Sequence, residues 1–219
     1  MTTMTLQKHL TINEIFYSIQ GESYLAGLPC IFVRLTGCHQ RCTYCDSEYA
    51  FYEGKKVTLG EIMDQIQAFP CHNILLTGGE PLLQGNCPLL AQLLLDAGYQ
   101  VAIETSGNRD ISCLPLAVIK IMDLKTPASH ECHRNNYDNL KFLQKQDEIK
   151  FVVMNESDTD WALDLIRDKK LEGLCHLSLS PTDKTLLPVI ADRILKSGLP
   201  VRLQIQFHKM IWPQKDRGF

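Results

Sequence analysis

The feature that most restricts the fold of this chain is a regular alternation between short apolar runs and longer segments with helical spacing. The apolar runs end at turn-forming residues, which predicts strands. Segments with an apolar residue every three or four positions predict helices between them. The expected strands span residues 31–35, 74–76, 101–104, 118–124, 148–154, 177–179 and 201–207, and the expected helices span residues 58–69, 89–97, 137–145, 159–169 and 186–196.

Strands that alternate with helices indicate βα units around a parallel sheet. The runs are continuously apolar, as expected for strands buried on both faces. About six such units fit into 219 residues, whereas a closed eight-stranded barrel usually needs roughly 250. The sequence therefore predicts an α/β protein, an incomplete, open parallel β/α barrel of about six strands, formed by a single domain over residues 1–219.

Composition excludes several other classes of protein. The 22 basic and 25 acidic residues give a net charge of −3, which argues against direct RNA or DNA binding through bulk positive charge. No apolar run reaches the roughly 18 residues of a transmembrane helix, and the first ten residues lack the layout of a secretory signal. We therefore expect a cytoplasmic protein that uses neither a membrane nor a nucleic acid as partner. Nine cysteines in such a chain predict reduced thiols for metal binding or redox chemistry.

Small and polar residues collect where the predicted strands end. They lie at positions 36–38, 77–80, 104–106, 125 and 180–181. The carboxyl ends of parallel strands meet at one edge of a sheet, and ligands bind at that edge. We therefore expect one ligand site, lined by these residues.

Three of the cysteines form a cluster, Cys38, Cys42 and Cys45, with the spacing C-x3-C-x2-C. A structural zinc site needs four ligands, whereas a [4Fe-4S] cluster held by three thiolates leaves one iron with free coordination sites. An open iron can bind and activate a substrate. A zinc site completed by His39 or by a remote cysteine remains an alternative, as does chance clustering of buried thiols.

A second motif, Thr77-Gly78-Gly79-Glu80-Pro81, follows the next predicted strand. Adjacent glycines allow a ligand to approach the backbone closely, and exposed carbonyl groups can accept hydrogen bonds from an ammonium group. By itself the motif also fits an ordinary tight turn. Its position one βα unit after the cysteine loop favours a role in the same site.

Together, the cysteine loop and the glycine turn resemble the radical S-adenosylmethionine (SAM) superfamily. The resemblance implies a [4Fe-4S] cluster whose open iron is chelated by the amino and carboxylate groups of SAM. One electron from the cluster then cleaves SAM, and the resulting 5′-deoxyadenosyl radical abstracts a hydrogen atom from the substrate.

A narrower resemblance, to the 7-carboxy-7-deazaguanine synthase family, rests on the segments 14–23 (EIFYSIQGES), 32–35 (FVRL) and 203–209 (LQIQFHK). It implies a carbon–nitrogen lyase that contracts the ring of 6-carboxy-5,6,7,8-tetrahydropterin with loss of ammonia, uses SAM catalytically with Mg²⁺, and serves queuosine or another 7-deazapurine pathway. The alternative is a radical SAM activating enzyme that generates a glycyl radical on a partner protein. Such enzymes share the cysteine loop but generally lack the pairing of the first and last segments.

The resemblance also assigns roles to residues, with no catalytic side chain because the radical arises on SAM. The three cysteines would hold the cluster, and Ser47 would bind Mg²⁺, although Ser47 fits a turn or N-cap role equally well. In place of Asp123-Leu124-Lys125 many members of the family have Ser-Pro-Lys, which leaves Lys125 as the surest of these three. SAM would contact Tyr44, Cys45, Asp46, Gly79, Glu104, Ser106, Asp123, Leu124, Lys125, Ser180 and Pro181.

The carboxypterin would contact Ile19, Gln20, Gly21, Glu22, Arg34, Thr77 and His208. Arg34 stands in an otherwise apolar strand, where a cation needs a partner. A substrate carboxylate would serve, and an internal ion pair is the alternative. Glu22 could equally be a solvated loop acid, and His208 a structural residue at a strand end.

The resemblance further implies a small-molecule substrate, an electron donor such as flavodoxin or ferredoxin, and a homodimer. The residues themselves reveal no interface. In the family the terminal carboxylate approaches the substrate, but at Phe219 a frayed chain end is the default expectation.

Overall fold

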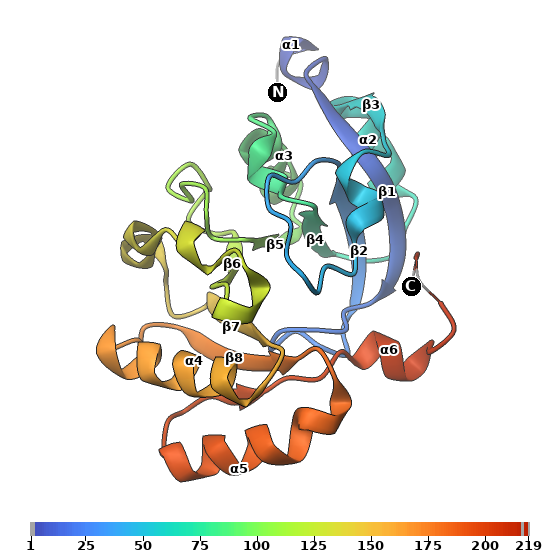
Figure 1. The fold of residues 1–219 in the computed structure, drawn as a ribbon. Helices are drawn as coiled ribbons and strands as arrows, with labels where there is room; N and C mark the ends of the chain where they lie inside the picture. The colour runs from blue at the N-terminus through green and yellow to red at the C-terminus, as the bar shows by residue number, and fades with distance from the viewer. Residues whose placement is uncertain (1–2, 216, 219) are drawn as a thin grey trace.

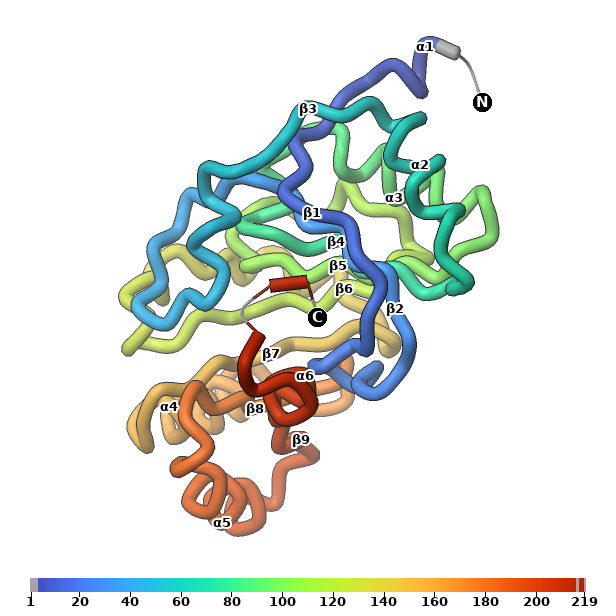
Figure 2. Tube along the Cα trace, turned by 90° about the vertical axis from the view of Figure 1, so that its right-hand side faces the viewer, coloured from blue at the N-terminus to red at the C-terminus, as the bar shows by residue number. Residues whose placement is uncertain are grey.

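The computed structural model describes residues 3–215, 217 and 218, so Phe219 lies outside the described residues. In this part of the chain, nine strands form one open sheet in the order β3-β1-β2-β4-β5-β6-β7-β8-β9, and Figure 2 shows β3 at one end and β9 at the other. The parallel strands are β2 (Pro29–Leu35), β4 (Asn73–Gly78), β5 (Gln100–Thr105), β6 (Ile119–Asp123), β7 (Glu148–Val153), β8 (His176–Pro181) and the two-residue β9 (Arg202–Leu203).

The expected open, parallel β/α arrangement is thus confirmed, with two additions at one edge. Strand β1 (His9–Ile19) pairs antiparallel with β2 and, on its other side, with β3 (Lys55–Thr58). The sequence pattern did not predict either strand. Most of β1 is only partly buried, so it lacks the continuous apolar run that identified the central strands.

The outer face of the sheet is covered by α2 (Leu59–Gln67), α3 (Cys87–Asp96), α4 (Glu156–Asp168) and α5 (Leu187–Ser197) (Figure 1). The predicted capping box of α2 is present, because the Thr58 hydroxyl accepts the Glu61 N–H and the Glu61 carboxylate accepts the Thr58 N–H. The helix α5 ends at Gly198 in the left-handed conformation, as predicted. The helices are α1 (Thr3–Leu6), α2 (Leu59–Gln67), α3 (Cys87–Asp96), α4 (Glu156–Asp168), α5 (Leu187–Ser197) and α6 (Phe207–Ile211).

Two predicted elements differ from the structure. The last strand, expected over 201–207, ends after Leu203. A short helix, α6 (Phe207–Ile211), follows it. The Phe207 N–H donates to the carbonyl of Gly21 at 2.8 Å. The helix expected at 137–145 is a 3-10 turn (Tyr137–Phe142). Its buried Asn139 side chain bonds to the backbone of the 107–111 loop, and these tertiary hydrogen bonds replace a regular helix.

The two faces of the sheet differ in character. Outward-facing strand residues and the helices α2 to α5 share one large hydrophobic core. The inner face carries a small apolar cluster that includes Phe32, Leu75 and Ile121. Because successive side chains alternate between faces, the next inner residue on each of these strands, two positions nearer the carboxyl end, is polar: Arg34, Thr77 and Asp123.

None of the helices in the described part of the chain combines the length and the apolar character needed to cross a bilayer.

Candidate active site

A cavity of about 540 Å³ opens at the carboxyl ends of the parallel strands. Phe32, Leu75 and Ile121 of the inner apolar cluster line it. The loop after β1, the cysteine loop and the segment that follows β9 also contribute to its lining. The position agrees with the edge of the sheet where the sequence predicted a ligand site.

All but two of the predicted site residues line this cavity. Leu124 is fully buried in the outer core, because strand alternation directs it away from the cavity while Asp123 and Lys125 face it. Gly21 lies beneath His208. The residues brought together are Ile19, Gln20, Glu22, Arg34, Cys38, Cys42, Tyr44, Cys45, Asp46, Ser47, Thr77, Gly79, Glu104, Ser106, Asp123, Lys125, Ser180, Pro181 and His208.

The cysteine loop is fastened to the segment after β6. The Thr43 N–H donates to the Ser129 carbonyl at 3.3 Å, and the Arg41 N–H donates to Glu131 Oε1 at 2.8 Å. His39, the candidate fourth ligand of a zinc site, does not line the cavity, and its Nε2 lies 2.6 Å from Asn108 Oδ1. Along the described chain, no three or more His, Cys, Asp or Glu side chains gather where a single metal ion could sit.

The three cavity cysteines are partly buried free thiols. Burial raises the pKa of Cys38, Cys42 and Cys45, that of Cys42 to about 11. The metal-binding form of cysteine is the thiolate. Binding of a cluster here therefore has to release protons from these groups.

The glycine turn lies directly against the cysteine loop. A Cβ atom on Gly79 would be 2.3 Å from the Gly37 carbonyl oxygen and 2.8 Å from Cys38 Cβ, so only glycine fits. The Glu80 N–H donates to the same Gly37 carbonyl at 2.8 Å. The backbone of one motif thereby sets the position of the other.

The Glu80 carboxylate is committed to internal hydrogen bonds. It is fully buried and accepts the Leu82 N–H, the Thr105 hydroxyl and the Ser106 N–H at 3.0, 2.9 and 2.7 Å. Glu80 therefore ties the turn after β4 to the turn after β5.

Lys125 and Asp123 form a close ion pair, with Nζ 2.6 Å from Oδ2. The Lys125 ammonium also lies 5.5 Å from the centre of the Tyr44 ring. Burial would lower the pKa of Lys125, but the Asp123 carboxylate raises it well above its usual range. This wall of the cavity therefore presents a permanently charged ammonium and an aromatic ring side by side.

Arg34 has the internal partner that the sequence left as an alternative. Its Nε lies 2.7 Å from Glu14 Oε1 on the neighbouring strand β1. The guanidinium also lies 5.6 Å from the ring centre of Tyr49, whose hydroxyl donates to the same Glu14 oxygen at 3.2 Å. Because Arg34 also lines the cavity, the ion pair orients the guanidinium without removing it from the site.

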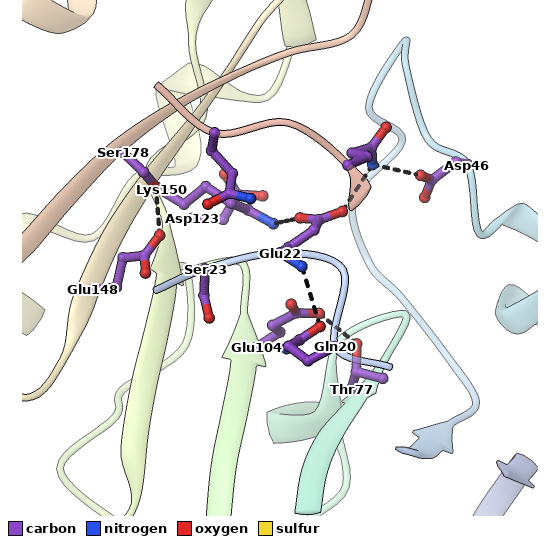
Figure 3. A network of polar contacts seen from close by, with 12 residues as sticks. Gln20, Glu22, Ser23, Asp46, Thr77, Glu104, Asp123, Glu148, Lys150 and Ser178 are labelled. Carbon is purple, nitrogen blue, oxygen red and sulfur yellow. Dashed lines mark hydrogen bonds and ion pairs between the residues drawn. The ribbon is translucent and has the colours of Figure 1, made fainter. Parts of the chain in front are cut away.

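Glu22 is held from two sides and is not a solvated loop acid. Its Oε2 accepts from Lys150 Nζ and its Oε1 from Gln206 Nε2, both at 2.8 Å (Figure 3). Burial would raise the pKa of Glu22, but the adjacent Lys150 ammonium lowers it to about 2. Glu22 is therefore an ionised hydrogen-bond acceptor.

Glu104 behaves differently from Glu22 although both face the same cavity. Its Oε2 accepts the Thr77 hydroxyl at 2.9 Å. Burial raises the pKa of Glu104, Lys150 opposes that rise, and Glu22 adds to it. Two carboxylates on one cavity thus have opposite shifts of pKa.

The loop after the cysteines meets the C-terminal segment across the cavity mouth. Asp46 Oδ1 accepts the Ser47 hydroxyl at 3.0 Å, and Asp46 Oδ2 lies 3.2 Å from Lys209 Nζ. His208 packs over Gly21, where an added Cβ would be 2.0 Å from its Nδ1. Burial lowers the pKa of His208. The first and last segments on which the family resemblance rests are thus in direct contact.

Sequence reasoning missed several residues of this cavity, of which Lys150, Gln206 and Arg217 matter most. Lys150 had a readable signal, because it is a lone cation inside the apolar strand run 148–154. Gln206 lies within the segment 203–209 that carries the family resemblance, but no role in the cavity was predicted for it. Arg217 had no such signal, since its place in the cavity depends on the path of the chain after β9. Arg217 pairs with Glu53 at 2.8 Å and lies 3.9 Å from the centre of the Tyr49 ring.

Several buried polar atoms on the cavity wall have no hydrogen-bond partner among the residues that the structure describes. Such atoms normally find a partner, from the protein or from a bound molecule. They therefore indicate that the cavity is built for a polar ligand. The atoms are Gln20 Nε2, Gln40 Nε2, Tyr44 OH, Ser106 Oγ and Asp123 Oδ1.

The cavity is also more positive than the chain as a whole, whose net charge is −3. Among the described residues, six cationic side chains face four carboxylates there. The surplus comes from the exposed cations at the cavity mouth, and a surplus of this sign favours the approach of anionic ligands. The cations are Arg34, Lys125, Lys150, Lys209, Lys215 and Arg217, and the carboxylates are Glu22, Asp46, Glu104 and Asp123.

Comparison with known proteins identifies the family. Residues 32–123 match the sequence model of the radical SAM superfamily. The 7-carboxy-7-deazaguanine synthase of Koribacter versatilis is 39% identical over 95% of this chain and 100% of its own length. The synthase of Chlorobaculum tepidum is 40% identical over 98% of this chain and 100% of its own length.

Solved structures agree on the fold. QueE from Escherichia coli superposes with a TM-score of 0.78 at 22% identity, covering 91% of this chain and 95% of that one. SuiB from Streptococcus suis, solved with SAM bound, gives a TM-score of 0.55 at 12% identity and covers 78% of this chain and 48% of that one.

The chain has an open, mostly parallel sheet with a three-cysteine loop at the carboxyl end of its first parallel strand. Together with the match to the superfamily model, this arrangement defines a radical SAM enzyme. Within that superfamily the chain belongs to the 7-carboxy-7-deazaguanine synthase family. Membership of the superfamily implies a [4Fe-4S] cluster and SAM as cofactors. It does not favour the zinc-module or activating-enzyme alternatives.

The residues present suit these cofactors. Three thiols and no fourth cysteine lie among the cavity residues that the structure describes, which is the donor set that leaves one iron open. The unpartnered Tyr44 hydroxyl, Ser106 hydroxyl and Asp123 oxygen offer donors and an acceptor to a nucleoside. Lys125 adds a cation beside them, where a carboxylate can bind.

We predict that Gly79→Ala displaces the cysteine loop, because the added methyl group collides with Gly37 and Cys38. The expected result is a lower iron content after anaerobic reconstitution and a loss of about 1–3 kcal/mol in the free energy of unfolding. Gly85→Ala is the matched control, since no atom of the described residues lies within 4 Å of its would-be Cβ. Equal iron content in the two variants would contradict the coupling between the motifs.

Proposed function

We propose that this chain is a 7-carboxy-7-deazaguanine synthase that contracts 6-carboxy-5,6,7,8-tetrahydropterin to 7-carboxy-7-deazaguanine with loss of ammonia. The main support for this proposal is that the three thiols and the two end segments line one cavity. The end segments contribute Gln20, Glu22, Gln206 and His208. The relatives that share these segments over their full length carry the synthase name.

The thiols of Cys38, Cys42 and Cys45 would hold the cluster. The bound cluster and SAM together supply a 5′-deoxyadenosyl radical. For SAM, the side chains that line the cavity beside the cysteine loop provide an aromatic surface, an ammonium group and hydroxyl donors. These residues are Tyr44, Asp46, Gly79, Glu104, Ser106, Asp123, Lys125, Ser180 and Pro181.

The substrate would bind between the two end segments. Its carboxylate suits the Arg34 guanidinium, which the Glu14 pair holds in orientation. Its amino-pyrimidinone edge carries adjacent N–H donors, and these suit the ionised Glu22 carboxylate. The backbone of Ile19 and Gln20, with the side chains of Gln20, Thr77 and His208, would complete this part of the pocket, and Gly21 would support His208 from beneath.

The cavity also serves to exclude water. Glu22 and Lys150 are each less than about one-sixth exposed, and the C-terminal segment with Lys215 and Arg217 forms part of the wall. A dry site prevents side reactions of a reactive intermediate. The chain thus contributes binding, orientation and shielding, while the hard chemistry resides in the cofactors.

We further propose Mg²⁺ as a third cofactor, bound through the Ser47 hydroxyl. Ser47 lines the cavity next to Asp46, and hard oxygen ligands suit this ion. The remaining proposals are a single catalytic domain, a homodimer, an external electron donor of the flavodoxin or ferredoxin type, and work in the reducing cytoplasm. All nine cysteines are free thiols, in keeping with the last point.

Anaerobic reconstitution tests the proposed function directly. We expect about four iron and four sulfide per chain, and formation of 7-carboxy-7-deazaguanine and ammonia when SAM, reductant and the carboxypterin are supplied. Cys42→Ala should lose iron and turnover, whereas Cys113→Ala, at an exposed thiol outside the cavity, should retain both. A chain loaded with cluster that cleaves SAM but leaves the carboxypterin unchanged would refute the assignment.

Replacement of Arg34 should weaken substrate binding selectively. For Arg34→Ala we expect a dissociation constant for the carboxypterin raised by roughly 10- to 100-fold, the loss of a charged hydrogen bond, with iron content and SAM cleavage retained. Glu14→Gln removes the ion pair that orients the guanidinium but keeps the guanidinium itself, so it should weaken binding less than Arg34→Ala does. If Arg34→Ala binds the carboxypterin as tightly as the parent chain, or fails to assemble a cluster, the substrate role of Arg34 is wrong.

Replacement of Ser47 tests the magnesium site. Ser47→Ala should raise the Mg²⁺ concentration needed for half-maximal turnover on the order of tenfold, whereas Ser47→Thr keeps a hydroxyl and should behave like the parent chain. Substrate-independent SAM cleavage serves as the control reaction. Identical Mg²⁺ curves for the alanine and threonine variants would remove Ser47 from the site.

A further inference from the structure

Lys150 is a buried cation on β7 with carboxylates around it from separate parts of the chain. Its side chain is 11% exposed, and its Nζ lies 2.8 Å from Glu22 Oε2. In the sheet register, Lys150 stands opposite Asp123 of β6 and Ser178 of β8. Figure 3 shows its side chain extending from β7 toward Glu22 on the loop after β1.

The neighbouring carboxylates are not equivalent partners for Lys150. Asp123 is already paired with Lys125 at 2.6 Å. Glu104 accepts its hydrogen bond from Thr77. Among the described residues, Glu22 is the carboxylate that forms an ion pair with Lys150, so the cation is directed to this one acceptor.

Glu22 is in turn fixed at three points. Lys150 holds Oε2, Gln206 holds Oε1, and the Glu22 N–H donates to Gln20 Oε1 at 3.4 Å. A carboxylate has about four acceptor positions on its two oxygens. Two of these are used by Lys150 and Gln206, which leaves an acceptor on each oxygen for a ligand with paired N–H donors.

We propose that Lys150 is a positioning residue for the substrate, which sets the orientation of the Glu22 carboxylate and acts through Glu22 rather than by its own contact with the pterin. This inference rests on the proposed function, because it assigns Glu22 to the donor edge of the carboxypterin. Removing one partner of a buried ion pair leaves an uncompensated charge. Without Lys150, the Glu22 carboxylate has to rotate toward water or bind a proton, and in either state it no longer presents two aligned acceptors.

A double-mutant cycle tests this relation. Lys150→Met, Glu22→Gln and the double variant are prepared with the cluster loaded, and the dissociation constant of the carboxypterin is measured by anaerobic calorimetry with SAM present. We expect each single change to raise the constant on the order of tenfold, and the double variant to match Glu22→Gln, since coupled residues are not additive. Additive losses would show that Lys150 acts independently of Glu22 and would overturn the proposal.

The chain offers a matched control in Lys120 on β6. Its Nζ lies 3.3 Å from Asp147 Oδ2, both side chains are at most 2% exposed, and neither residue lines the cavity. Lys120→Met should lower the free energy of unfolding but leave the dissociation constant unchanged. If Lys120→Met weakens binding as much as Lys150→Met, the effect is one of general stability and the proposal is wrong.

Two further variants keep the test decisive. Lys150→Arg retains the charge and can still donate charge-assisted hydrogen bonds to the Glu22 carboxylate, so binding should stay within about threefold of the parent chain. Lys150→Gln removes the charge but keeps a neutral N–H donor, and takes the place of Lys150→Met in the cycle if the latter does not load iron. Tight binding by Lys150→Gln equal to that of the parent chain would contradict the need for a cation.

The outcome also separates this inference from the proposed function. If the parent chain neither binds nor converts the carboxypterin, the function itself is wrong, and the assigned role of Glu22 and Lys150 falls with it. If the parent chain converts the carboxypterin and the cycle is additive, the function stands and only the role of Lys150 is lost.

Discussion

The contact between the ends of β2 and β4 is the constraint on which the whole site depends. The two strands pair in parallel as far as Leu35 and Gly78, and beyond that point the backbones of Gly37 and Gly79 touch without room for a side chain. Backbone atoms, rather than flexible side chains, therefore fix the position of the cysteine loop, and of any group bound to it, relative to the sheet. Precise placement of this kind is what a reactive intermediate requires of a protein, because small displacements of reacting atoms cost a large part of the rate.

The alternation of side chains along the strands then distributes the remaining functions. One face of each central strand supplies the outer core, and the other supplies an apolar floor followed by a polar end. Opposite charges at these polar ends neutralise one another in pairs, Arg34 with Glu14 and Lys125 with Asp123. Burial strongly disfavours an unpaired charge. Pairing with a carboxylate therefore allows Arg34 and Lys125 to stay ionised on the cavity wall, where they can bind anionic groups.

Much of this arrangement could be predicted from the sequence, because the signals were local. The six longer parallel strands, four of the helices and the cysteine and glycine motifs each have a pattern contained within a dozen residues. The edge strands β1 and β3 could not be recognised, since their partial burial arises only when they pair with β2 and with each other. The 3-10 turn at Tyr137–Phe142 was not predicted for a similar reason, because it depends on hydrogen bonds between Asn139 and a loop that is distant in the sequence.

The residues of the functional site could likewise be predicted only where the signal lay in a short stretch of sequence. Strand ends, cysteines and the lone cation Arg34 identified the cavity, but the partner of Arg34 lies 20 residues away on a strand that the pattern missed. The rule that singled out Arg34, a cation within an apolar run, applies equally to Lys150 in 148–154. Gln206 belongs to the identifying segment 203–209, but its contact with Glu22, like the position of Arg217, depends on the path of the chain after β9, which no local pattern encodes.

The contact between Glu22 and Gln206 joins residues 184 positions apart. Closing so long a loop costs chain entropy before any contact compensates for it. We therefore expect the pocket walls contributed by the two ends of the chain to depend on prior assembly of the sheet. Hydrogen exchange should accordingly find residues 19–24 and 204–209 less protected than the central strands.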